Sequence, residues 1–167
     1  YGAFNISLVN DLPLFIDPFL LFNSKKPRYR QLHEDILNYL RFLRDQSIER
    51  GEIKTGDLRA LFTFPEIKQT WLGFSLHGNQ GRGPGLVFAK ALNQNMKGVF
   101  QNFDDTQIAA SPHLEKLCLI KDNVGRDQIS DFVTNLTLPF LLDYTQSFCQ
   151  KNVDAKFLRT FYVPHVE

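Results

Sequence analysis

Residues 125–140 carry a polar stripe and an apolar stripe at helical spacing. Asp127, Asp131 and Asn135 recur every fourth position and would share one side of a helix. The opposite side would carry a set of apolar residues at i, i+3, i+4 and i+7: Ile129, Phe132, Val133, Leu136 and Phe140. This pattern predicts a long helix over residues 126–150 with one face in a hydrophobic core.

A second long helix is predicted over residues 27–50. Pro27 suits a first helical turn and Gly51 suits a helix end. The apolar positions that would share one face are Leu32, Ile36, Leu40 and Leu43. His33 is expected on the surface. A short helix is expected over 56–62, and Pro65 is expected to open another that runs to Trp71.

Three segments are predicted as strands of a small sheet. They are residues 3–9, the apolar run that ends at Asp17, and residues 157–163 near the C-terminal end. We therefore expect an α-dominated α+β fold with four or five helices, built as one domain over residues 1–167. A fragment of a longer chain is the alternative for a sequence that runs from Tyr1 to Glu167.

The molecule carries almost no net charge. Nineteen Lys and Arg residues face eighteen Asp and Glu residues, which leaves a net charge of +1. A global electrostatic footprint for nucleic acid or membrane is therefore absent. One dense basic cluster, Lys25, Lys26, Arg28 and Arg30, is either a solvated loop or a phosphate contact. Without a signal peptide or a long apolar span in the sequence, we expect a cytoplasmic protein with no membrane partner.

A glycine-rich segment, residues 73–85, precedes a predicted amphipathic helix. It contains five glycines, and Pro84 suits the first turn of the helix that follows. Free N–H groups at a helix start attract anions, so Arg82, Gly83 and Gly85 are candidate phosphate-binding residues. Arg126 is a fourth candidate, at the start of the 126–150 helix. The alternative is a flexible loop that lets two helices pack closely.

Three carboxylates are candidates for a catalytic metal site. Asp17, Asp127 and Asp131 offer the hard oxygen ligands that Mg²⁺ or Mn²⁺ prefers. Such an ion would activate water for attack on a phosphodiester. Two structural alternatives stay open. Asp17 would accept backbone N–H groups in a turn around Pro18, and Arg126 would pair with the acids of the helix.

The placement of these acids loosely resembles that of PIN-type nucleases. In that resemblance an Asp at a strand tip precedes a Gly-x-Asp-x-x-x-Asp helix, here Gly125 to Asp131, and Glu52, Asp57 or Glu66 would be the middle acid. The runs Gly81 to Gly85 and Gly125 to Asp131 also resemble uncharacterised bacterial proteins of antiphage defence loci. These resemblances imply a metal-dependent nuclease, or another phosphodiester-processing component, that acts on nucleic acid in bacterial defence.

A second function fits the same residues. In a non-enzymatic helical interaction module, the acids would order the loop before the 126–150 helix rather than bind metal. The partners would then be other proteins in a multi-protein complex, or further copies of the chain. Spatial clustering of Asp17, Asp127 and Asp131 would favour catalysis, whereas an Asp–Arg network of Asp127, Arg126 and Asp131 buried under aromatic side chains would favour the structural alternative.

Overall fold

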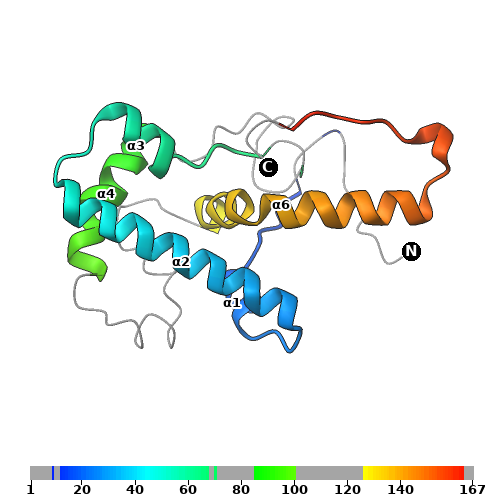
Figure 1. Ribbon diagram of the computed structural model, residues 1–167, viewed down its shortest axis with the longest axis horizontal. Coiled ribbons are helices and arrows are strands. Elements are labelled where there is room, and N and C mark those ends of the chain that lie inside the picture. The colour runs from blue at the N-terminus through cyan, green and yellow to red at the C-terminus, as the bar shows by residue number, and fades with distance from the viewer. Residues whose placement is uncertain (1–8, 10–11, 68–69, 71–84, 101–125, 164–167) are drawn as a thin grey trace.

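A computed structural model describes residues 9, 12–67, 70, 85–100 and 126–163. This part of the chain forms five α-helices and one short 3-10 helix (Figure 1). The helices are α1 (Pro18–Phe22), α2 (Pro27–Arg50), α3 (Thr55–Phe62), α4 (Leu86–Phe100) and α6 (Arg126–Asn152), followed by the 3-10 helix η3 (Ala155–Phe157). None of them, within these ranges, has the length and apolar character of a membrane span.

The expected sheet is wrong, because the described residues contain no β-strand. Asp17 does not end a strand; its side chain caps α1 by accepting a hydrogen bond from the Phe19 N–H at 2.9 Å. Pro18 then occupies the first turn of α1, where its missing N–H costs nothing. Residues 158–163 also form no strand, and residues 3–8 lie outside the described part. The fold is therefore helical where it is described.

Helix α2 has the predicted bounds. It begins at Pro27 and ends at Arg50, and Gly51 follows with a φ of 64°, a backbone conformation that glycine adopts readily. His33 is not on the surface as expected; it is only 7 % exposed and its ring lies 5.0 Å from that of Phe22. Burial lowers the pKa of His33, although Glu34 opposes part of this effect.

Helix α3 also agrees with the prediction, but the helix expected to open at Pro65 does not begin there, and residues 68, 69 and 71 of the expected helix lie outside the described part. Residues 65–67 are irregular, and they carry the chain from α3 towards α6. Phe64, just before this segment, packs edge-on against Phe132 of α6 with ring centroids 4.5 Å apart. This aromatic contact fixes the irregular segment on the core.

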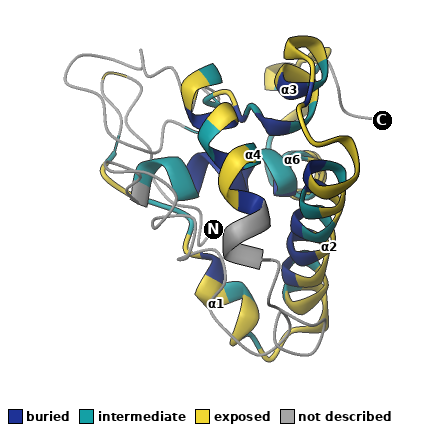
Figure 2. Cartoon of the chain, turned by 90° about the vertical axis from the view of Figure 1, so that its left-hand side faces the viewer, coloured by how far each residue is buried: buried dark blue, intermediate teal, exposed yellow. Residues whose placement is uncertain are grey.

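The core lies where α2, α3, α4 and α6 meet (Figure 2). Its fully buried large side chains include Leu37 and Leu43 of α2, Phe62 of α3, Leu92 of α4 and Phe132 of α6. The buried faces of these helices turn towards one another, and their outer faces are exposed. Burial of these side chains supplies the main driving force for folding.

Helix α6 divides into two parts with different surroundings. Residues 130–134 are all buried, whereas residues 143–147 are all exposed. Pro139 lies inside the helix between the two parts. The segment after α6 turns back in the direction of the start of the helix, as Figure 1 shows. The N-terminal half of α6 therefore belongs to the core, and its C-terminal half presents a surface.

Candidate functional site

Two distant segments are tied to the N-terminal half of α6. The Ile16 N–H donates a hydrogen bond to Ser130 Oγ at 2.9 Å. On the next turn, the Asn135 side-chain amide donates to the carbonyl oxygen of Pro65 at 2.8 Å. The chain next to Asp17 and the chain next to Glu66 are thus both fixed to the helix that carries Asp127 and Asp131.

Asp131 is the most perturbed acid of this region. It is 9 % exposed, and its pKa is raised to about 7. Burial is the largest cause, because a charged carboxylate is poorly solvated there, and the charges of Asp127 and Glu66 add to the effect. Glu66 and Asp127 therefore both lie within electrostatic range of Asp131.

The predicted metal triad is not assembled in the described part of the chain. Within that part, no group of three or more His, Cys, Asp or Glu side chains is arranged to hold a metal ion. Asp17 is exposed and engaged as the cap of α1, which agrees with the structural alternative for this residue. Binding of Mg²⁺ or Mn²⁺ by Asp17, Asp127 and Asp131 stays a prediction.

The predicted phosphate-binding residues are described only in part. Arg82 and Gly83 lie outside the described residues, and so does the side chain of Arg126, the first residue of α6. Gly85 is exposed at the start of α4, and its carbonyl oxygen accepts a hydrogen bond from the Ala89 N–H at 3.1 Å. An added Cβ at Gly85 would meet nothing within 4 Å, so side-chain space does not require glycine there.

A second cluster lies where the start of α2 meets the middle of α6. Three rings form a row: Tyr29 lies 5.9 Å from Phe140 in an edge-on contact, and Phe140 lies 6.2 Å from Tyr144. Tyr144 is 55 % exposed, and the other two rings are partly exposed. We call these rings, with Lys26 and Arg28, the aromatic–basic surface.

Two cations lie over the rings of this surface. The Lys26 ammonium is 5.2 Å from the centre of the Tyr29 ring, and the Arg28 guanidinium is 4.4 Å from that of Phe140. Arg28 also forms an ion pair with Asp143 of α6 at 2.7 Å, which anchors the guanidinium to that helix. Lys25 is exposed beside this surface in the sequence. Positive charge and the exposed Tyr144 ring therefore occur on one surface.

The sequence pattern predicts the basic half of this surface but not the aromatic half. Lys25, Lys26, Arg28 and Arg30 form a dense cluster in the sequence, but the charge pattern does not mark Tyr29 among them as part of a surface. The spacing of Phe140 and Tyr144 was an available signal, because residues four apart share a helix face. The contact between α2 and α6, more than a hundred residues apart in sequence, had no such signal.

The comparisons with known proteins give a family without an assigned activity. A family model described as Domain of unknown function (DUF8370) matches residues 1–165. No curated protein and no solved structure matches the chain.

Proposed function

We propose that this chain, which belongs to the family Domain of unknown function (DUF8370), binds single-stranded nucleic acid on the aromatic–basic surface. The observation that carries the proposal is the row of rings Tyr29, Phe140 and Tyr144 with Lys26 and Arg28 over it. Proteins that bind single strands combine positive charge for the phosphates with aromatic faces on which bases stack.

The charges support a single strand rather than a duplex. Arg28 is held by Asp143, so Lys25, Lys26 and the exposed Arg30 are the cations of this cluster left to contact phosphates. Three cations make a weak electrostatic footprint, in keeping with the net charge of +1. Stacking on exposed Tyr144 is therefore needed to supply much of the affinity, and bases are available for stacking only when they are unpaired.

The nuclease hypothesis is a separate prediction. It requires Asp17, Asp127, Asp131 and a divalent ion, none of which belongs to the aromatic–basic surface. A protein that binds a single strand without cutting it would satisfy the present proposal. The competing hypothesis is a module that binds other proteins through the same exposed rings. The effects of Tyr144→Ala on nucleic-acid binding and on self-association distinguish the two hypotheses.

Fluorescence anisotropy with labelled single-stranded DNA and RNA, and with the matching duplexes, tests the proposal. We expect the wild type to prefer the single strands. Tyr144→Ala should weaken binding about 5- to 150-fold, which corresponds to the roughly 1 to 3 kcal/mol that one stacked base contributes. Lys26→Gln should reduce the salt slope of binding by about 0.7, as expected for one phosphate contact on a single strand.

Arg59→Gln is the matched control, because Arg59 is an exposed cation on α3, far along the chain from this surface. Its affinity and salt slope should equal those of the wild type. The proposal fails if the wild type binds none of the strands at about 50 mM salt, where electrostatic binding is favoured. It also fails if Tyr144→Ala binds normally but changes self-association in sedimentation, because the rings would then form a protein interface.

A further inference from the structure

Arg28 lies at the centre of the aromatic–basic surface. Its guanidinium is 4.4 Å from the centre of the Phe140 ring, and Phe140 is the ring of the row that contacts both Tyr29 and Tyr144. Each base of a single strand has a phosphate next to it. A strand that stacks on the exposed Tyr144 ring would therefore bring its phosphates close to Arg28.

Asp143 holds this guanidinium in the structure. Arg28 Nη2 donates a hydrogen bond to Asp143 Oδ2 at 2.7 Å, and the two side chains are each 59 % exposed. A carboxylate and a phosphate are both anions whose oxygens accept N–H bonds from a guanidinium. Asp143 therefore occupies donors of Arg28 that a nucleic-acid phosphate could use.

The ion pair between Arg28 and Asp143 can be exchanged, but at a cost. Pairs between exposed side chains are weak, because water screens both charges. The ring contact with Phe140 does not involve Asp143, so it would keep the guanidinium in place after the pair breaks. Exchange would, however, leave the charge of Asp143 next to a phosphate, and like charges repel. Asp143 therefore determines how much Arg28 contributes to binding.

We propose that Arg28 is a phosphate-binding residue of the aromatic–basic surface and that Asp143 limits its access to nucleic acid. Both roles rest on the proposed function, because they concern the same surface. Arg28 adds a fourth cation to Lys25, Lys26 and Arg30, and Asp143 is a competitor for the phosphate that belongs to the chain itself. Removal of the Asp143 charge releases Arg28 for a phosphate.

Fluorescence anisotropy with a labelled single strand, over a range of salt concentrations, tests the role of Asp143. At about 50 mM salt, Asp143→Asn should bind about 3- to 10-fold more tightly than the wild type, and its salt slope should steepen by about 0.7, because one more phosphate contact forms. In an Arg28→Gln background, Asp143→Asn should not steepen the slope, since the cation that it releases is then absent. Simple repulsion between Asp143 and the strand would give the same gain in both backgrounds.

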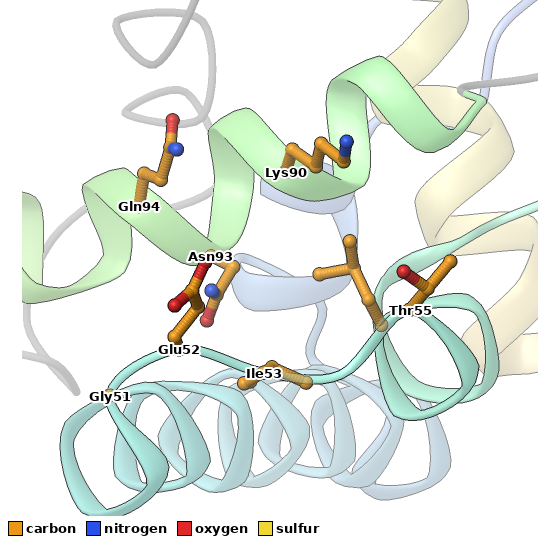
Figure 3. Close-up of a pocket in the computed structure, with 8 residues that line it drawn as sticks. Gly51, Glu52, Ile53, Thr55, Lys90, Asn93 and Gln94 are labelled. Atoms are coloured by element: carbon orange, nitrogen blue, oxygen red, sulfur yellow. The ribbon is translucent and has the colours of Figure 1, made fainter.

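Asp57→Asn is the matched control. Arg50 and Asp57 form a second exposed ion pair, at 3.2 Å, with side chains 48 % and 49 % exposed. Arg28 and Arg50 lie near opposite ends of α2, about 33 Å apart along a helix that rises about 1.5 Å per residue. The control pair lies at the α2–α3 corner, where the chain faces α4 across a pocket (Figure 3). Asp57→Asn should leave the affinity and the salt slope unchanged.

The role of Asp143 is overturned, and the proposed function stands, if the wild type binds and Asp143→Asn has the same affinity and salt slope. The same conclusion follows if Asp57→Asn gains as much as Asp143→Asn, or if Asp143→Asn gains equally in the Arg28→Gln background. Absence of binding by both the wild type and Asp143→Asn would overturn the proposed function and the role of Asp143 together.

Discussion

Asp131 combines burial with the field of two other carboxylates, and this combination makes its ionisation costly. Its pKa is about 7 in the folded chain against 3.8 for a free side chain. The folded state thus binds the Asp131 proton more tightly than the unfolded state does. The free energy of unfolding should therefore fall as pH rises from about 3.8 to about 7 and then stay level with respect to this group.

The variant Asp131→Asn isolates this effect, because asparagine has similar shape and no charge. We expect it to be more stable than the wild type at pH 8, with an advantage that grows by roughly 2 to 3 kcal/mol between pH 5 and pH 8. Urea unfolding at both pH values measures it. Asp35→Asn, at an exposed position of α2, should show no such growth. An advantage of Asp131→Asn that does not change with pH would contradict the pKa assignment.

Asp17 offers a test that separates a structural role from a catalytic one. Asp17→Ala should lose the cap of α1 and cost about 0.5 to 2 kcal/mol, whereas Asp17→Asn keeps an oxygen that can accept the Phe19 N–H. The two variants are compared by urea unfolding and by cleavage of labelled DNA and RNA with Mg²⁺ or Mn²⁺. Wild-type cleavage that disappears in the stable Asp17→Asn variant would establish a metal ligand or catalytic acid. If Asp17→Asn cleaves as fast as the wild type, the role of Asp17 is limited to capping α1.

Single residues also show what the sequence could and could not reveal. His33 lies three positions before Ile36 and four before Leu37, so helical spacing placed it on the buried face. The surface position was expected because histidine is polar, and this expectation is wrong. The cap role of Asp17 was available from the Asp-Pro pair alone. The carboxylate cluster at Asp131 was not, because Glu66 reaches it only through tertiary packing.

At the scale of elements, local signals served well for helices and poorly for extended segments. Pro27 and Gly51 located both ends of α2, and the apolar spacing located α6. The expected strand before Asp17 failed because a capped proline starts a helix there. Residues 158–163 look like a strand in composition, but in the described part they have no neighbouring strand to pair with. Strand formation depends on such a partner, which the local sequence does not specify.

The contact between α6 and the segment after α3 should dominate stability. Phe132 is fully buried and packs on Phe64, so Phe132→Ala should lower the free energy of unfolding by about 3 to 5 kcal/mol. Phe161→Ala is the matched control, because that ring is 81 % exposed, and its change should stay within about 0.5 kcal/mol. Chemical denaturation measures both. A small loss for Phe132→Ala would show that α6 does not share the core.

For the molecule as a whole, the proposed nucleic-acid binding lies at one end of the helical core. The N-terminal half of α6 is used for packing, and its middle meets α2 to form the aromatic–basic surface. The pocket at the α2–α3 corner lies at the other end of α2. A near-neutral protein can bind a single strand in this way, since charge needs to be concentrated only where bases can also stack.

Ultraviolet cross-linking of a single strand, followed by mass spectrometry of the attached peptides, tests this assignment most directly. We expect cross-links to Tyr29, Phe140 or Tyr144, and a loss of the Tyr144 cross-link in Tyr144→Ala together with weaker binding. Strong binding whose cross-links all fall on other parts of the chain would contradict it.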